Sequence, residues 1–406
     1  MNVWDFKSSP KLSTLSERCR VPEQTERLLP RLMRSVPITR VSELTPLDLL
    51  DVPVFAAVTP LARDLTTHAG KGASPLEARL SAVMEAVERV SAEGVAPERV
   101  VRSCYSALPE TERLDPRSCD LPDATSFRED REFSFVVGRE LLSRRPQFVP
   151  LDLVISPPEE GILSHVDTNG LAAGNTHLEA VVHAICEVIE RDALSQFEFC
   201  AEFDDDASRA SFRAVHPQSL PGWSKPWQDR IRQAGMQLRV HQLRSDLRVP
   251  TLQAILYDPR FSVDGAEALA TFPGFGSHPN AEVALRRCLS EAFQARTAYL
   301  QGARDSFNVV NPSRTGAARR LRLRLLTAAP ELDFSQLPSF ESSDLLVDLE
   351  FLLTSLADVG LDRVVAVDLT RPDFGVPVVR VRVPGLQCFV VNQRRIGWRC
   401  WRLLVA

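Results

Sequence analysis

Three stretches of the sequence repeat one arrangement of acidic and amide side chains: Ser81-Ala-Val-Met-Glu85-Ala-Val-Glu88-Arg89, Ala184-Ile-Cys-Glu187-Val-Ile-Glu190-Arg191-Asp192 and Cys288-Leu-Ser-Glu291-Ala-Phe-Gln294-Ala-Arg296. Each stretch places two such side chains three positions apart, on one face of a helix. Apolar residues fill most of the other positions, so we expect largely buried helices. If the three helices converge, their carboxylates supply the hard oxygen ligands that Mg²⁺ shares with the phosphates of a nucleotide.

A purely structural role is the alternative for these carboxylates. Each stretch also carries an arginine that can pair with a glutamate: Arg89, Arg191 and Arg296. A buried carboxylate needs either such a partner or a metal ion. The spacing alone leaves both possibilities open.

The composition restricts the class of protein. The chain has 406 residues, 44% hydrophobic and 25% charged, which is typical of a globular protein with one large or two ordinary domains. Its net charge of −5 gives no basic bias, so we expect no nucleic-acid partner. No apolar stretch approaches the roughly 20 residues of a membrane-spanning helix, so we expect no membrane span.

The eight cysteines form no Cys-x-x-Cys pair, which argues against a zinc ribbon. Residues 1–30 are polar and lack the apolar core of a secretion signal. We therefore expect reduced thiols and a cytoplasmic protein.

Helical periodicity predicts long helices at 76–93, 178–197 and 280–301, which carry the three stretches. Apolar segments bounded by turn residues predict strands at 38–58, 133–137, 147–154, 238–243, 250–257, 364–369 and 376–383. This is an α+β pattern.

The segments between these elements lead to further expectations. Residues 97–132, rich in Pro, Asp and Arg, are expected to form an irregular surface insertion, and residues 274–279 a glycine loop. We expect an N-terminal extension at 1–36, one large domain at 37–390 and a tail at 391–406. His183 lies one turn before Glu187, where a role in supporting the metal ligands is the alternative to the favoured one, a hydrogen-bonded histidine in the core.

Two glycine-rich segments precede the first two predicted helices: Gly70-Lys71-Gly72 and Gly170-Leu-Ala-Ala-Gly174-Asn175. Backbone N–H groups at a helix N-terminus can bind phosphate, and a lysine can pair with it. Neither segment is a P-loop, and most glycine turns before helices are only turns.

Together and in order, these segments resemble the YcaO family from about Ile38 to Pro384. The resemblance rests on the three stretches, on Gly70-Lys71-Gly72 and Asn169-Gly-Leu-Ala-Ala-Gly174-Asn175-Thr, and on Val367-Asp368-Leu-Thr-Arg371-Pro and Pro384-Gly-Leu. It implies an α+β fold of mixed or antiparallel sheets packed with long helices, and an ATP site between the three motif helices.

The resemblance also implies a chemistry. Members of the family use ATP to phosphorylate the oxygen of a backbone amide, after which a nucleophile adds to the carbon and phosphate leaves. The product is an azoline with a Cys, Ser or Thr side chain, a thioamide with sulfide, or an amidine with an amine. A nucleotide-binding accessory protein without peptide chemistry is the alternative from another class.

The residue roles that the resemblance implies follow the motifs. Five glutamates would bind Mg²⁺: Glu85, Glu88, Glu187, Glu190 and Glu291. Lys71 and Ser81 would contact phosphate. The remaining ATP-site residues would contact the nucleotide or orient the glutamates: Asn175, Arg191, Gln294 and Arg296. No residue is identified as the nucleophile.

Three departures from the family pattern concern the substrate and product. Thr59-Pro60 stands where Arg-Pro is frequent, and Gln387 where glutamate is frequent. The chain ends Trp401-Arg-Leu-Leu-Val-Ala406, without the proline-rich tail of azoline-forming members. Its closest likeness is to members that work beside a TfuA-type protein, so we expect a thioamide product, a peptide or protein substrate, a peptide-recruiting partner such as TfuA, and a homodimer.

Overall fold

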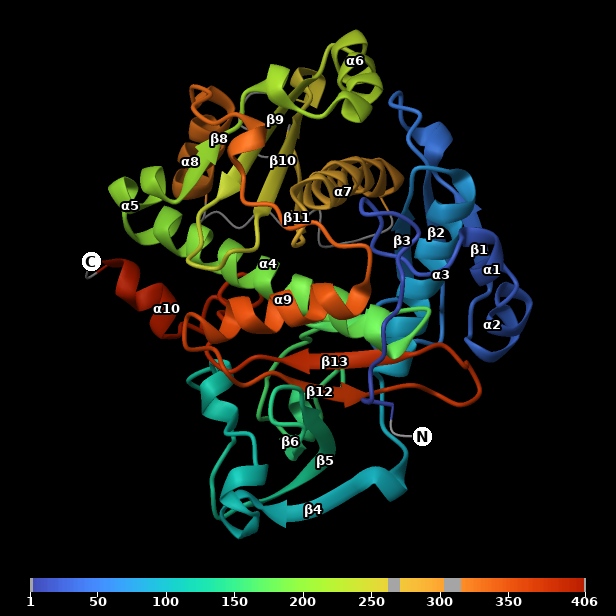
Figure 1. Ribbon diagram of the computed structural model, residues 1–406, viewed down its shortest axis with the longest axis vertical. Helices are drawn as coiled ribbons and strands as arrows, with labels where there is room; N and C mark the ends of the chain where they lie inside the picture. Colours follow the sequence, from blue (N-terminus) through green and yellow to red (C-terminus); the bar gives the residue numbers. More distant parts are fainter. Residues whose placement is uncertain (1–2, 262–270, 303–314, 405–406) are drawn as a thin grey trace.

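The computed structural model describes residues 3–261, 271–302 and 315–404. Within them, antiparallel sheets of three, four and six strands are packed with long helices, which confirms the α+β prediction (Figure 1). The strand orders are β1-β2-β3, β11-β10-β9-β8 and β4-β5-β12-β13-β7, with β6 paired to β5. None of the helices in these residues is both long and apolar enough to cross a membrane.

The strands are β1 (Arg40–Glu43), β2 (Val54–Val58), β3 (Thr67–Lys71), β4 (Val100–Cys104), β5 (Glu132–Glu140), β6 (Pro146–Pro150), β7 (Leu171–Ala173), β8 (Phe212–Ala214), β9 (Gln237–Leu243), β10 (Thr251–Tyr257), β11 (Thr271–Ser277), β12 (Val365–Asp368) and β13 (Val378–Arg382). The helices are α1 (Pro22–Glu26), α2 (Leu29–Ser35), α3 (Pro75–Ser91), α4 (His177–Phe203), α5 (Asp205–Ala210), α6 (Lys225–Gln233), α7 (Ala281–Gln301), α8 (Thr315–Thr327), α9 (Leu345–Ala357) and α10 (Trp398–Trp401).

The three predicted motif helices are confirmed as α3, α4 and α7, and each one follows a strand of a different sheet: β3, β7 and β11. A side-chain cap starts each helix. Ser74, Thr176 and Asn280 accept hydrogen bonds from backbone N–H groups in the first turns of α3, α4 and α7. The same local unit thus builds all three walls of the candidate site.

Glycine lets each strand or its end lie against its helix. A Cβ atom on Gly70 would lie 2.0 Å from the backbone nitrogen of Ala82, and one on Gly274 would lie 2.2 Å from that of Ala292. On Gly174, just after β7, it would lie 2.5 Å from the backbone nitrogen of Ala180. These distances leave no room for any other residue.

Two sequence predictions about irregular segments were wrong in part. Residues 97–132 contain β4, an edge strand of the six-stranded sheet. Most of the segment 274–279 is not a loop, because Gly274 to Ser277 complete β11 and pair with Thr251 to Ala254 of β10. In β11 the glycines serve close packing against α7 instead of a turn.

Both ends of the chain pack on the catalytic core. Leu29 and Leu32 of the N-terminal extension join the core around α3, and Lys11 forms a buried ion pair with Asp348 at 2.8 Å. Arg399 in the tail pairs with Asp192 of α4 at 2.9 Å, and both side chains are buried. Asp192, in the second acidic stretch, therefore pairs with the tail, and we assign it no ligand.

Candidate active site

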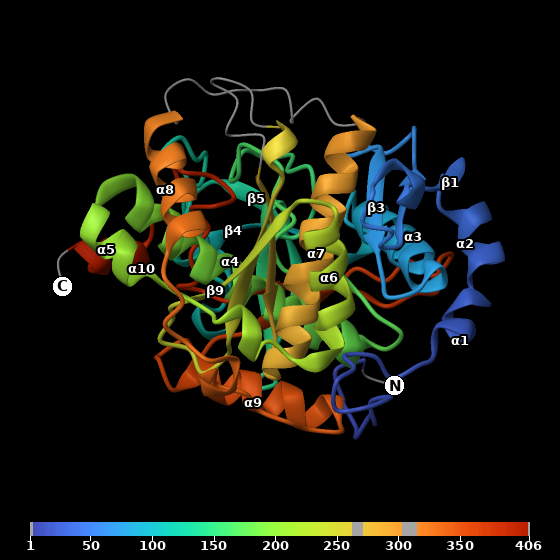
Figure 2. The ribbon, with the colours of Figure 1, turned by 90° about the horizontal axis from the view of Figure 1, so that it is seen from above.

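A groove of about 710 Å³ lies between α3, α4 and α7. Figure 1 shows α7 above α4 with α3 beside them, and in Figure 2, from above, β3 lies between α7 and α3. The N-terminal extension forms a further wall through Leu12, Leu15 and residues 16–18. The groove therefore combines segments that lie far apart in the sequence.

The five predicted metal ligands all line this groove: Glu85, Glu88, Glu187, Glu190 and Glu291. Glu88 accepts a hydrogen bond of 2.8 Å from the backbone N–H of Ala173. Glu190 is only 2% exposed, and its Oε2 atom has no hydrogen-bond partner. A buried carboxylate oxygen without a partner is costly unless a cation approaches it.

Burial and mutual repulsion disturb the titration of these carboxylates. Burial, with repulsion from Glu85, raises the pKa of Glu88 well above its usual range. Burial raises the pKa of Glu187 to about 7, although Arg191 opposes the shift. Burial and the charge of Glu291 raise the pKa of Glu190. Such a group of acids is stabilised by added positive charge.

Glu291 behaves differently because Lys71 lies beside it. The Lys71 ammonium is 3.0 Å from Glu291 Oε2. Burial pushes the pKa of Glu291 upward, but Lys71 and Arg191 outweigh that effect and hold the pKa below its usual range.

A purely structural salt-bridge network would require close pairing between the glutamates and the neighbouring arginines, and this pairing is only partial. Arg89 pairs with Glu85 at 3.0 Å, but it also binds Asp64 at 3.1 Å. Arg191 stays 3.8 Å from Glu187 and 3.9 Å from Glu190, beyond hydrogen-bond range. Arg191 therefore forms only long ion pairs with Glu187 and Glu190 and does not hydrogen-bond to either.

The carboxylates are near one another but not yet arranged as a chelate. In the described part of the chain, no three His, Cys, Asp or Glu side chains are close enough together to hold one ion. Like charges separate when no cation lies between them, so small side-chain rotations are needed to share Mg²⁺. The donor set is still the one that Mg²⁺ prefers, namely carboxylate oxygens beside a phosphate site.

Most of the other predicted ligands also line the groove: Lys71, Ser81, Asn175, Arg191 and Gln294. Asn175 donates to Glu179 at 2.9 Å and accepts from Thr25 of the N-terminal extension at 2.8 Å. Gln294 donates to the Ala69 carbonyl at 3.1 Å. These contacts fix both amides at the wall of the groove.

Arg296 does not line the groove. Its guanidinium pairs with Asp48 at 2.9 Å and Asp258 at 2.8 Å, and its side chain is 3% exposed. Two helical positions separate it from Gln294, which turns it to the far side of α7. The structure therefore places it in a buried ion-pair cluster, away from the carboxylates.

Sequence reasoning missed a polar cluster at one end of the groove. Arg287 lies 2.9 Å from Glu17 Oε2 and 2.7 Å from His183 Nδ1, and all three side chains line the groove. His183 was expected in the core but lies at the groove wall. Helical spacing had pointed to His183, one turn before Glu187, and the same spacing before Glu291 could have identified Arg287. Glu17 gave no such signal.

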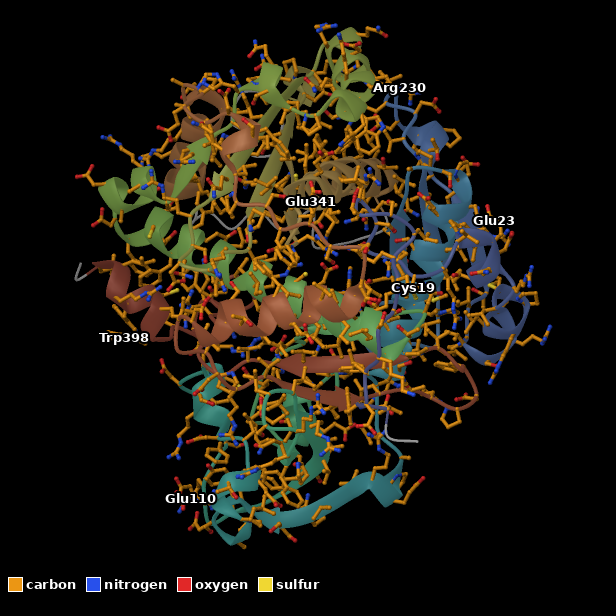
Figure 3. All side chains as sticks on the ribbon, viewed as in Figure 1. Cys19, Glu23, Glu110, Arg230, Glu341 and Trp398 are labelled. Carbon is orange, nitrogen blue, oxygen red and sulfur yellow. The ribbon has the colours of Figure 1, made fainter. Side chains whose placement is uncertain are left out.

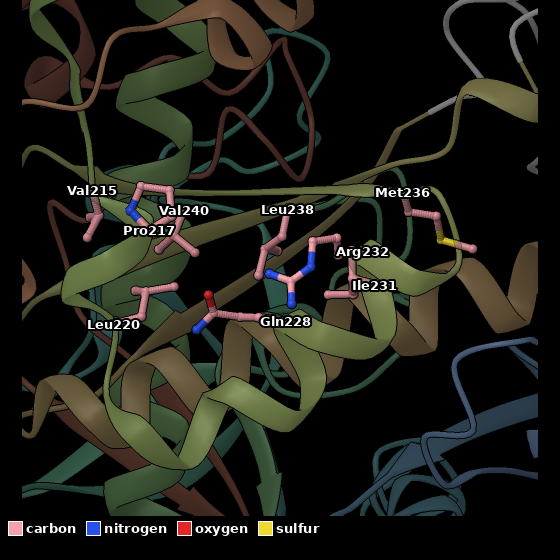
Figure 4. Close-up of a pocket in the computed structure, with 9 residues that line it drawn as sticks. All are labelled: Val215, Pro217, Leu220, Gln228, Ile231, Arg232, Met236, Leu238 and Val240. Carbon is pink, nitrogen blue, oxygen red and sulfur yellow. The ribbon is translucent and has the colours of Figure 1, made fainter.

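A second hollow, of about 210 Å³, lies between α6 and strands β8 and β9 (Figure 4). Val215, Ile231, Leu238 and other mainly apolar side chains line it. Its only charged side chain, Arg232, already pairs with Asp229 at 2.7 Å. The acidic, basic and amide side chains described above line the groove between α3, α4 and α7 instead.

Comparison with known proteins shows what the chain is similar to. Residues 69–387 match the model of the family described as YcaO cyclodehydratase, ATP- and Mg²⁺-binding. A protein of Methanothermobacter thermautotrophicus is 35% identical over 398 residues, covering 93% of this chain and 97% of its own length. A Rhizobium leguminosarum bv. trifolii protein described as lying in the tfuA 3′ region is 30% identical and covers 95% of this chain and 92% of its own length.

A solved structure shares the fold. YcaO from Methanopyrus kandleri, bound with AMPPCP and Mg²⁺, superposes with a TM-score of 0.75 at 26% sequence identity. The match covers 97% of this chain and 98% of the Methanopyrus chain. The likeness thus extends beyond the motif helices to the N-terminal extension and the tail.

Proposed function

The chain belongs to the YcaO family, which binds ATP and Mg²⁺, and on that premise we propose that it activates a peptide backbone amide to make a thioamide. The observation that carries this proposal is the partnerless Oε2 atom of Glu190 among the converging motif carboxylates. Such an oxygen suits Mg²⁺ bound to a nucleotide better than it suits a structural salt bridge.

The residues of the groove would act mainly by holding and neutralising charge. When bound, ATP supplies a phosphoryl group that turns the amide oxygen into a good leaving group. Glu85, Glu88, Glu187, Glu190 and Glu291 hold Mg²⁺ in this proposal. Lys71 and Arg191, which line the same groove, would pair with the phosphates. Positioning and charge neutralisation are the usual basis of catalysis in phosphoryl transfer.

Ser81, Asn175 and Gln294 complete the proposed nucleotide contacts. All three line the groove, and their side chains can donate hydrogen bonds to phosphate or ribose oxygens. Because Arg296 lies outside the groove, we assign it a supporting role behind α7 and no contact with the nucleotide.

The nucleophile is expected to come from outside this chain. Among the described residues that line the groove, none is a cysteine. External sulfide, which gives a thioamide, and a substrate side chain, which gives an azoline, both remain compatible with the groove. The relative in the tfuA 3′ region favours the thioamide and a TfuA-type partner that recruits the peptide.

Peptide mass distinguishes these outcomes. The enzyme is mixed with a TfuA-type partner, ATP, Mg²⁺, sulfide and candidate peptides, and the peptide masses are measured by mass spectrometry. A thioamide raises the mass by the difference between sulfur and oxygen, whereas an azoline lowers it by one water. Binding of ATP without phosphate release for every peptide would instead support an accessory nucleotide-binding protein.

A further inference from the structure

Arg287 is held at one end of the groove by two groups, and among the described residues it forms no ion pair with Glu190 or Glu291. Its NH1 group lies 2.9 Å from Glu17 Oε2 and 2.7 Å from His183 Nδ1. Only 17% of the Arg287 side chain and 23% of the Glu17 side chain are exposed. Glu17 belongs to the N-terminal extension, outside residues 69–387 that match the family.

The protonation states of Glu17 and His183 favour their contacts with Arg287. Burial raises the pKa of Glu17, but Arg287 and Arg18 outweigh it and hold the pKa well below its usual range. Burial and the charge of Arg287 lower the pKa of His183 to about 4. At neutral pH Glu17 is therefore charged and His183 neutral, so that Nδ1 can accept the hydrogen bond from Arg287.

Arg287 is also electrostatically close to two of the proposed metal ligands. It lies one helical turn before Glu291 on α7, and it lines the same groove as Glu190 and Glu291. Glu190 Oε2 is buried and has no hydrogen-bond partner. If Arg287 were released from Glu17, it would form an ion pair with Glu190. That ion pair would compete with Mg²⁺ for the Glu190 carboxylate.

We propose that Glu17 is a positioning residue that keeps Arg287 away from Glu190 and Glu291, and so leaves both carboxylates available to Mg²⁺. This inference rests on the proposed function, since it takes the motif carboxylates as metal ligands. It gives the N-terminal extension a direct part in the metal site, through one carboxylate.

The test compares Glu17→Gln with Glu23→Gln. Gln keeps the shape of the glutamate side chain but removes its charge. Glu23 is an exposed residue of α1 in the same extension, and Figure 3 shows it at the outer surface. Calorimetry measures AMPPCP binding by the full-length protein across a series of Mg²⁺ concentrations, and thermal unfolding confirms that each variant is folded.

Glu17→Gln is expected to raise the Mg²⁺ concentration needed for half-maximal AMPPCP binding by about tenfold. Glu23→Gln should leave it unchanged. Adding Arg287→Gln to Glu17→Gln should restore the wild-type Mg²⁺ dependence, because the competing cation is gone. Unchanged Mg²⁺ dependence in Glu17→Gln, or no restoration in the double variant, would overturn the inference.

Two further variants separate this inference from the proposed function. Glu187→Gln should weaken Mg²⁺-dependent binding; if it does not, the carboxylates are not metal ligands and the proposed function fails first. Arg287→Gln alone should not raise the Mg²⁺ requirement, and it provides the test if Glu17→Gln does not fold. A raised requirement in Arg287→Gln would show that Arg287 binds the nucleotide directly, against the role given to Glu17.

Discussion

The ammonium group of Lys71 lies 3.0 Å from the carboxylate of Glu291, although the two residues are 220 positions apart in the sequence. Lys71 ends β3 and Glu291 lies in the middle of α7, so this pair joins two walls of the groove. In the protein without ligands, Lys71 supplies positive charge next to a proposed metal ligand. When Mg²⁺ binds Glu291, we expect the Lys71 ammonium group to leave that carboxylate and pair with phosphate.

Replacing Lys71 by methionine should therefore impair nucleotide binding more than folding. We expect the KM for ATP to rise at least tenfold, because the phosphates lose a cation that lies within the groove. Lys225→Met is the matched control, since Lys225 is exposed on α6. Steady-state ATP turnover measures both variants, and equal KM values would contradict the phosphate role.

The raised pKa of Glu187, about 7 against 4.5 for an ordinary glutamate, has a consequence for stability. Between those values the folded protein holds a proton that the unfolded chain has lost, so stability falls as pH rises. The free energy of unfolding of the ligand-free protein should decrease by roughly 1–3 kcal/mol more in the wild type than in Glu187→Gln from pH 5 to pH 7.5. Urea denaturation at both pH values measures this difference, and parallel behaviour of the two proteins would refute it.

The close contact between β11 and α7 predicts a large effect of Gly274→Ala. The new Cβ atom would lie 2.2 Å from the backbone nitrogen of Ala292, and backbone cannot move aside locally. We expect the free energy of unfolding to fall by roughly 1–3 kcal/mol or more. Gly94→Ala is the control, because a Cβ atom there meets nothing within 4 Å. Equal stability of the two variants would show that the packing does not require glycine.

Arg296→Met should destabilise the protein without a specific effect on ATP. Asp258 keeps its ion pair with Arg260 at 2.8 Å, but Asp48 stays buried without its arginine, and such a loss typically costs about 3–5 kcal/mol. Below the melting temperature, the KM for ATP should match that of the wild type. Arg191→Met gives the contrast, with ATP turnover reduced at least tenfold and a smaller loss of stability. A raised KM in folded Arg296→Met would restore the nucleotide contact that the sequence suggested.

Helical periodicity and capping residues were sufficient to locate the motif helices. The sequence predicted a helix at 280–301, and α7 spans Ala281–Gln301. The acidic spacing likewise brought five glutamates to one groove, because i, i+3 geometry is a local property of a helix. Features set by local rules were thus predictable.

Features that depend on distant packing were not predictable. Gly274 and Gly276 suggested a loop, but they lie in β11 because α7 approaches the strand closely. Helix geometry turns Arg296 to the far side of α7, but no local pattern identifies Asp48 and Asp258 as its buried partners there. Glu17 reaches the groove only because the N-terminal extension folds back along α4 and α7.

The central claim is that carboxylates from three helices bind Mg²⁺ together with ATP. Calorimetric titration of the protein with AMPPCP, with and without Mg²⁺, tests it most directly, using Glu190→Gln and the control Glu202→Gln, an exposed residue of the same helix. We predict Mg²⁺-dependent binding to the wild type and Glu202→Gln, and a loss of affinity of at least tenfold in Glu190→Gln. Binding that does not depend on Mg²⁺, or that survives unchanged in Glu190→Gln, would contradict the claim.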